Sequence, residues 1–166
     1  IYIGNFYPHK NVEMLINAFE KVDKKYILIL VGPQDFFSGR VERIIKDRGL
    51  TERVSFFYNA TLSDLVFFYK NAQALIHPSL SEGFGLTPIE AMHFDCPVVA
   101  SNIEVFKETL GESYISFNPK DEMSILNAIR KATSARGAQA KKPSKIFSFD
   151  MMAKETVDVY KIVSSI

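Results

Sequence analysis

Two glutamates and two glycines lie close together in the middle of the chain. Residues 77–92 read HPSLSEGFGLTPIEAM: an apolar run leads into a loop that carries Glu82, Gly83 and Gly85, and a helix is expected to follow. The first N–H groups of a helix lack partners and its dipole favours negative charge, while glycines permit positive φ angles and a close approach to a ligand. We therefore expect a phosphate site here, with Glu82 and Glu90 both pointing at one bound molecule.

A lysine in a second loop could serve the same ligand. Lys10 follows the apolar run 1–3 in the sequence YPHKN, near the start of the next expected helix. A lysine at a helix start is slightly unfavourable because the dipole repels it, so an anionic partner is favoured over a purely solvated side chain. The neighbouring Asn11 is a candidate cap for this helix.

Other residue types that often do chemistry are sparse. His77 and His93 have no second ligand at a useful spacing, so each is expected to be a packed or surface histidine, and no metal site is predicted. The chain contains no Asp-x-Asp pair. Cys96 is the only cysteine, which excludes an internal disulfide, and we expect it to pack in the core.

Glu90 has a second interpretation. The sequence TPIE fits a capping box in which Thr87 is the N-cap, Pro88 occupies the first helical position and Glu90 reaches back to the Thr87 N–H group. This stretch alone does not decide between a helix cap and a ligand-binding residue.

Alternating apolar runs and amphipathic segments indicate an α/β fold. Strands are expected over residues 1–3, 26–31, 54–58, 74–77, 97–100 and 114–117. Helices are expected over residues 12–19, 38–47, 61–69, from about 87, and over 106–110, 121–132 and 151–163, with a polar loop over 133–145. This order predicts a Rossmann-like parallel sheet flanked by helices, with ligands at the carboxyl ends of the strands.

Composition narrows the class of protein. The 166 residues suit one domain with a sizeable core, and 47% hydrophobic against 23% charged residues indicates a globular protein. The net charge of +1 gives no overall basic field, so no nucleic-acid partner is expected. No apolar run approaches the ~20 residues that span a bilayer, and no signal peptide opens the chain. Because the chain begins IYI without a methionine, we expect it to be part of a longer protein. We expect that protein to be cytoplasmic, or peripheral at a membrane that it would contact through other regions.

The run EGFGLTPIE resembles the E-x7-E signature of retaining glycosyltransferases of family 4, the group 1 glycosyltransferases, whose two-domain architecture is called GT-B. Three more segments resemble the family, in the family's order. The opening strand, lysine loop and helix are matched by YIGNFYPHKNVEMLINAF, the strand after the signature by PVVASN, and the closing helix by FSFDMMAKETVDVY. Four ordered segments are far more specific than one. The resemblance implies that residues 1–166 are the C-terminal, donor-binding half, with a C-terminal helix at about 150–165, and that the N-terminal acceptor domain is absent from this sequence.

The resemblance also assigns roles to residues of both loops. Lys10 would neutralise the diphosphate of a nucleotide-sugar donor, Glu82 would lie beside the sugar at the reacting carbon, and Glu90 would bind both ribose hydroxyls. Lys10 and Glu82 are thus the implied catalytic residues, and the choice between Glu82 as nucleophile and as electrostatic stabiliser stays open. Backbone contacts to sugar and phosphate are implied for Gly83, Phe84, Gly85, Leu86 and Thr87.

Three further positions fit the family less closely. Many members carry an arginine after the first glycine, where this chain has Asn5, and His9 could partly replace that phosphate contact. Tyr58 ends the third expected strand, where members place the nucleobase beside a glycine that this chain lacks. Asn5, His9 and Tyr58 are therefore included as donor-binding candidates.

The implied function is transfer of a hexose from a UDP- or GDP-linked sugar to a glycan or lipid-linked acceptor, without a cofactor or a metal. The PHKN loop resembles mannosyltransferase-like branches, which suggests GDP-mannose. Without the acceptor domain, the chain alone should bind the donor but scarcely turn over. The alternatives are a GT-B-type nucleotide-sugar epimerase or phosphorylase, and a non-catalytic Rossmann-like binding module. A dinucleotide oxidoreductase is disfavoured because no G-x-G-x-x-G follows the first strand.

Overall fold

The computed structural model describes residues 1–134 and 148–164. Its strands are β1 (Tyr2–Ile3), β2 (Leu28–Gly32), β3 (Val54–Tyr58), β4 (Leu75–His77), β5 (Val98–Ser101) and β6 (Ile115–Phe117). Its helices are a 3₁₀ turn, η1 (Pro8–Lys10), and α1 (Val12–Glu20), α2 (Phe36–Asp47), α3 (Leu62–Asn71), α4 (Leu86–His93), α5 (Glu104–Leu110), α6 (Glu122–Thr133) and α7 (Phe149–Ser164). Every expected strand and helix is present, while the expected loop over 133–145 falls almost wholly outside the described residues.

The strands are parallel and form two halves of one sheet. Pairing runs β1-β2-β3 in the first half and β4-β5-β6 in the second. The halves meet at β1 and β4, where the Ile76 N–H donates to the Ile1 carbonyl at 2.8 Å and the Ile1 nitrogen donates to the Ala74 carbonyl at 2.9 Å. The chain therefore moves outward from β1 to β3 and then crosses back to β4, beside β1. Sheets of this kind bind ligands outside the carboxyl ends of the strands at such a switch point.

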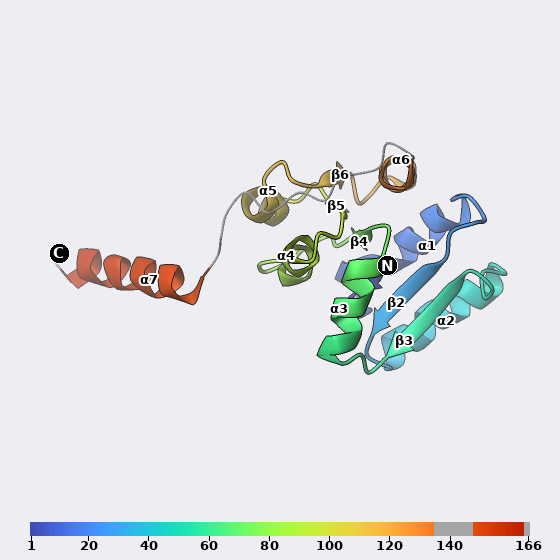
Figure 1. The fold of residues 1–166 in the computed structure, drawn as a ribbon, viewed down its shortest axis with the longest axis horizontal. Helices are drawn as coiled ribbons and strands as arrows, with labels where there is room; N and C mark the ends of the chain where they lie inside the picture. The colour runs from blue at the N-terminus through green and yellow to red at the C-terminus, as the bar shows by residue number, and fades with distance from the viewer. Residues whose placement is uncertain (135–147, 165–166) are drawn as a thin grey trace.

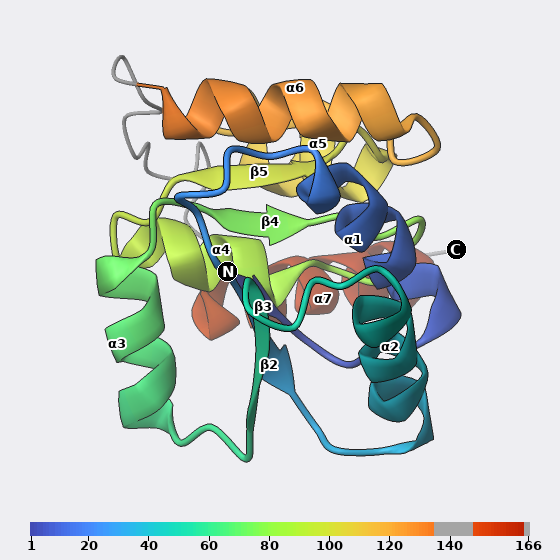
Figure 2. The ribbon, with the colours of Figure 1, turned by 90° about the vertical axis from the view of Figure 1, so that its right-hand side faces the viewer.

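Helices cover both faces of the sheet. Figure 1 shows α1, α2 and α6 on one side of the strands and α3, α4 and α5 on the other. Side chains alternate between the faces: Leu30 and Ile76 belong to the core beneath the first group, and Val31 and Leu75 to the core beneath the second. Figure 2 shows β4 and β5 side by side, with α6 running along them.

Local sequence fixes where two of the helices begin. The Asp35 carboxylate accepts a hydrogen bond from the Ser38 N–H at 2.8 Å, so α2 begins two residues before the expected position. Thr61 and Asp64 form a capping box at the start of α3, in which the Asp64 N–H donates to the Thr61 hydroxyl at 3.2 Å. This box holds in place the helix whose last turn carries Tyr69.

The final helix, α7, falls where the closing helix is expected and lies apart from the sheet in Figure 1. Its described side chains are exposed, Tyr160 at 69% among them. Within residues 1–134 and 148–164, no helix is long and apolar enough to cross a membrane.

Candidate functional site

The two loops that follow β1 and β4 meet at the carboxylate of Glu82. Its Oε1 atom lies 2.7 Å from Lys10 Nζ, 2.7 Å from His77 Nε2 and 2.7 Å from the Ser79 hydroxyl oxygen. His77 ends β4, and Ser79 and Glu82 follow it, whereas Lys10 ends the turn after β1. The residues that the sequence separates by 72 positions are thus in direct contact at the switch point of the sheet.

The cluster is partly shielded from solvent. The side chains of Lys10, Glu82 and His77 are 14%, 10% and 3% exposed. Burial by itself raises the pKa of Glu82, but hydrogen bonds from His77, Lys10 and Ser79 outweigh it and lower the pKa to about 2. Glu82 is therefore ionised throughout the neutral range. Among the described residues, none donates a hydrogen bond to its second oxygen, Oε2, so one oxygen is held and the other is open to a ligand.

Backbone and amide contacts tie the same loops together. The Leu80 N–H donates to the His9 carbonyl at 2.7 Å. The Asn11 side-chain amide donates to the carbonyls of Pro78 at 3.1 Å and Pro119 at 2.8 Å, so it joins three loops. Asn11 does occupy the N-cap position of α1, but its side chain makes no cap hydrogen bond; the expected capping interaction is wrong because the amide is engaged elsewhere.

The turn before α4 depends on Gly85. This residue has φ of +79° and is the N-cap of the helix, and a Cβ atom there would lie 2.5 Å from Cε1 of Phe106. Gly83 differs from the expectation, because its φ is not positive and a Cβ atom there would meet nothing within 4 Å. Phe84 and Leu86 on either side of Gly85 are 40% and 63% exposed. The turn is therefore exposed at Gly83 and Phe84 and buried at Gly85.

The helix α4 begins at Leu86, which overturns the capping box proposed for Thr87. Thr87 lies inside the helix, and no side chain caps the helix N-terminus. Because Gly85 takes the left-handed conformation, the helix starts before Thr87 and leaves no role for it as N-cap. The N–H groups at the start of α4 are thus available to an anion.

Glu90 has another partner. The Tyr69 hydroxyl donates to Glu90 Oε2 at 2.9 Å. Tyr69 is 2% exposed and its ring stacks on Phe94, with centroids 5.8 Å apart and an interplanar angle of 9°. Burial, and then the charge of Glu90 and the hydrogen bond to it, raise the pKa of Tyr69 well above its ordinary value, so the phenol stays protonated and donates.

The three less certain candidates lie outside the Glu82 cluster. The Tyr58 hydroxyl donates to Glu42 at 2.6 Å, and burial followed by this bond raises the pKa of Tyr58 to about 12. Asn5 accepts from the Tyr7 N–H at 3.4 Å through its side chain and from the Tyr2 hydroxyl through its carbonyl. His9 is exposed and reaches the second loop only through its carbonyl, as described above.

A family model covers most of the chain. The family described as Glycosyl transferases group 1 matches residues 1–146. The chain belongs to this family. One relative of this glycosyltransferase chain is the O-antigen chain mannosyltransferase RfbU of Salmonella typhimurium, which is 35% identical over 128 residues, 77% of this chain and 36% of the relative.

Solved structures share the architecture. Sucrose-phosphate synthase from Thermosynechococcus elongatus matches with a TM-score of 0.82 and 27% identity, over 99% of this chain and 45% of that one. HepE from Anabaena, solved in complex with UDP and glucose, matches with a TM-score of 0.80 and 22% identity, over 96% and 47%. The glycosyltransferase chain therefore spans less than half the length of these proteins. The expected fold, a Rossmann-like parallel sheet flanked by helices, as in one half of a GT-B glycosyltransferase, is confirmed.

Sequence reasoning missed three residues of the candidate site: His77, Ser79 and Tyr69. His77 was expected to be merely packed or on the surface; it is packed, but it also contacts Glu82. The sequence could have indicated that His77 and Ser79 act together, because residues two positions apart in a strand lie on the same face. Tyr69 gave no local signal, since its partner Glu90 lies on another helix. Cys96 is buried as expected.

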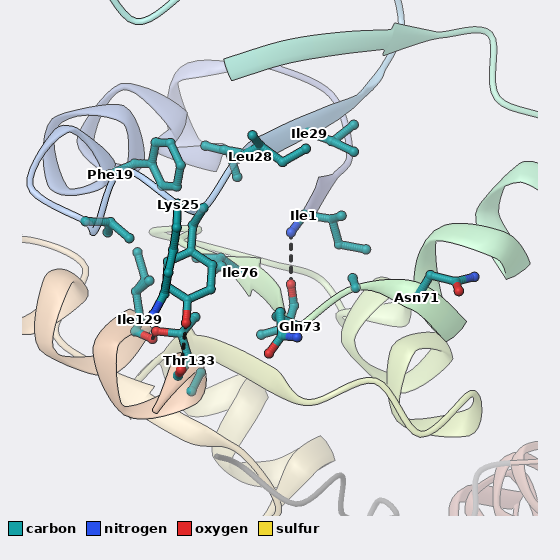
Figure 3. Close-up of a pocket in the computed structure, with 16 residues that line it drawn as sticks. Ile1, Phe19, Lys25, Leu28, Ile29, Asn71, Gln73, Ile76, Ile129 and Thr133 are labelled. Atoms are coloured by element: carbon teal, nitrogen blue, oxygen red, sulfur yellow. Dashed lines mark hydrogen bonds between the residues drawn. The ribbon is translucent and has the colours of Figure 1, made fainter. Parts of the chain in front are cut away.

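A cavity of about 250 Å³ lies at the opposite edge of the sheet (Figure 3). It opens near the beginnings of β1, β2 and β4, where Ile1, Leu28 and Ala74 line it. Most of the other lining side chains are apolar, among them Phe19 and Ile129. The strand ends that carry the Glu82 cluster point away from this cavity, which is thus a separate feature.

Proposed function

We propose that this chain is the donor-binding half of a retaining family 4 glycosyltransferase, which transfers a hexose from a nucleotide-diphosphate sugar. The observation that carries the proposal is the 2.7 Å contact between Lys10 and Glu82 where the two halves of the sheet meet. It places a cation suited to a diphosphate and a carboxylate suited to a sugar in one location, at the strand edge where such folds bind ligands. The uncapped N-terminus of α4 follows Glu82 by only a few residues.

The diphosphate would lie between Lys10 and the start of α4. A nucleoside diphosphate gains negative charge as it leaves, and fixed positive groups that meet this charge lower the barrier. The three protons of the Lys10 ammonium allow it to keep one hydrogen bond to Glu82 while another is donated to phosphate. The exposed residues Gly83 and Phe84, the buried Gly85 beside them and the N–H groups of Leu86 and Thr87 would complete this part of the site.

The sugar would lie beside Glu82 and the ribose beside Glu90. Stabilisation of positive charge at the reacting carbon and nucleophilic attack on it both require an ionised carboxylate. The hydrogen bonds that keep the pKa of Glu82 at about 2 maintain this form. On Glu90, the oxygen that Tyr69 does not contact would accept from a ribose hydroxyl.

The relatives support a proposal for the substrate class. RfbU is named as a mannosyltransferase of O-antigen chains, which favours mannose as the sugar and a glycan or lipid-linked molecule as the acceptor. GDP-mannose is the proposed donor, with a UDP-linked hexose as the second choice because HepE was solved with UDP and glucose. No further cofactor is proposed. Acceptor binding would belong to an N-terminal domain outside these residues, so this chain alone would bind the donor with scarcely any turnover.

A melting-temperature screen tests the proposal. The purified protein is heated with UDP, GDP, ADP, dTDP and their sugars, in the wild type, in Lys10→Ala and in Lys24→Ala, which removes an exposed lysine just before the start of β2. A ligand at about a hundred times its dissociation constant stabilises the folded state by roughly 2.7 kcal/mol. We expect one diphosphate to raise Tm in the wild type and in Lys24→Ala, but not in Lys10→Ala. Equal shifts in all three proteins, or none in any of them, would contradict the proposed site.

A further inference from the structure

We propose that Tyr69 is a positioning residue that holds Glu90 ready for the ribose hydroxyls of the donor. The inference rests on the proposed function, in which Glu90 binds ribose. Tyr69 itself would not touch the nucleotide, because its side chain is buried. Helix α3 would therefore contribute to nucleotide recognition through a single hydroxyl group.

The contact joins a fixed group to a mobile one. Tyr69 is 2% exposed, its ring stacks on Phe94, and its helix is anchored at the start by the Thr61 capping box, so packing restricts the phenol. Glu90 is exposed, and an exposed glutamate samples many rotamers. Among the described residues, only Tyr69 hydrogen-bonds its carboxylate, and it does so at Oε2. The bond selects one orientation and leaves Oε1 open.

Selecting this orientation before binding raises affinity. A ligand that must immobilise a side chain loses part of its binding free energy to that ordering, and a protein that has already ordered the group avoids the loss. The cost is about that of one rotamer-rich side chain, which corresponds to roughly threefold to tenfold in dissociation constant. The raised pKa of Tyr69 keeps the phenol protonated, and so able to donate, above the pH at which an ordinary tyrosine ionises.

A purely structural bond is the competing explanation, because the same contact also ties α3 to α4. Losing a tie between helices would lower the stability of the fold and weaken every nucleotide alike. Losing a positioning contact would weaken only nucleotides that offer the hydroxyls that Glu90 binds. The two explanations therefore differ in their dependence on the sugar of the nucleotide.

Calorimetric binding of GDP, UDP and their 2′,3′-dideoxy forms, which lack both hydroxyls, separates them. The proteins are wild type, Tyr69→Phe, which keeps the ring and removes only the hydroxyl, and Tyr26→Phe, which removes a hydroxyl bonded to the Thr133 carbonyl at 2.8 Å at the other edge of the sheet. We expect the wild type to prefer the ribose form, and Tyr69→Phe to lose about threefold to tenfold in affinity for it with no change for the dideoxy form. Tyr26→Phe should bind as the wild type does.

Two results would overturn the inference, and they differ from each other. Equal losses for ribose and dideoxyribose forms in Tyr69→Phe, or no loss for either, would show that the hydroxyl does not position Glu90, while the ribose role of Glu90 would stand. A wild type that binds both forms equally would refute the ribose role of Glu90 itself, and the inference with it.

Discussion

Glu82 receives three hydrogen bonds at one oxygen, and only one of the donors is a fixed cation. In the proposed complex the diphosphate competes for that cation, Lys10, and draws it away from the carboxylate. His77 and Ser79 carry no group that a phosphate would attract as strongly, and both are buried. They would keep the Glu82 carboxylate in place when the donor is bound.

Replacing His77 tests this role. His77→Leu removes the donor to Glu82, and a hydrogen bond to a charged group contributes about 1.5–3 kcal/mol. We expect the affinity advantage of GDP-mannose over GDP, or of UDP-glucose over UDP, to fall about tenfold in His77→Leu. His77→Gln, whose amide can donate near the position of Nε2, should retain most of it. Calorimetry measures both ratios, and an unchanged ratio in His77→Leu would show that His77 does not act through Glu82.

Sequence patterns pointed to Lys10 and Glu82 as separate residues but not to their contact or to His77. The reason is that the loop from 77 to 82 folds back on its strand, which depends on contacts with a distant part of the chain. The bond from the Leu80 N–H to the His9 carbonyl is one of these contacts, and no local pattern encodes it. His77 looked isolated because its partner Glu82 follows it by five positions in a loop, a spacing that no standard motif marks.

At the scale of elements, the N-terminus of α4 depends on one glycine. Gly85→Ala would place a methyl group against the Phe106 ring and force a positive φ on alanine. The left-handed conformation costs about 1–2 kcal/mol and overpacking about 1–3 kcal/mol, so we expect a loss of roughly 2–5 kcal/mol in the free energy of unfolding. Urea denaturation measures it.

Gly83→Ala is the matched control in the same turn. A methyl group there meets nothing within 4 Å, and the backbone does not require a positive φ, so the free energy of unfolding should change by no more than about 0.5 kcal/mol. If both variants lost a similar amount of free energy of unfolding, neither the positive φ of Gly85 nor its contact with Phe106 would explain the loss.

The position of α4 also shows where sequence prediction stops. The strand, the loop and the helix were all expected, because apolar runs and glycines mark them. The capping box at Thr87 had a suitable sequence, yet a cap contributes only about 1 kcal/mol and was overridden by the close packing of Gly85 against Phe106. A capping preference of about 1 kcal/mol is too small to outweigh such a tertiary contact.

At the scale of the whole molecule, Asn11 joins loops from both halves of the sheet. Its amide bonds the loops after β4 and β6, while its own loop follows β1, and its φ is +58°. Asn11→Gly keeps the left-handed conformation and removes both hydrogen bonds, so we expect a loss of about 1–3 kcal/mol in the free energy of unfolding. Asn11→Ala should lose about 1 kcal/mol more because alanine disfavours that conformation. Urea denaturation would contradict this account if the glycine variant were as stable as the wild type.

The arrangement of the whole sheet was the most predictable part. Alternating strands and helices follow from hydrophobic periodicity, and right-handed connections leave few ways to order parallel strands. The amide that joins three loops was not predictable, because Asn11 at a helix start most often caps its own helix. The sequence predicted a local cap, whereas the Asn11 amide donates to the Pro119 carbonyl, 108 positions away.

The ion pair of Lys10 and Glu82 also bears on how fast a nucleotide arrives. Opposite charges 2.7 Å apart cancel at a distance, so this ion pair projects little field into solvent, where salt screens charges beyond ~8 Å in any case. Electrostatic steering of an anion requires an uncompensated positive potential. Capture of the diphosphate by this chain should therefore proceed at an ordinary diffusive rate with little dependence on ionic strength, and the lysine would exert its pull only after the anion has arrived.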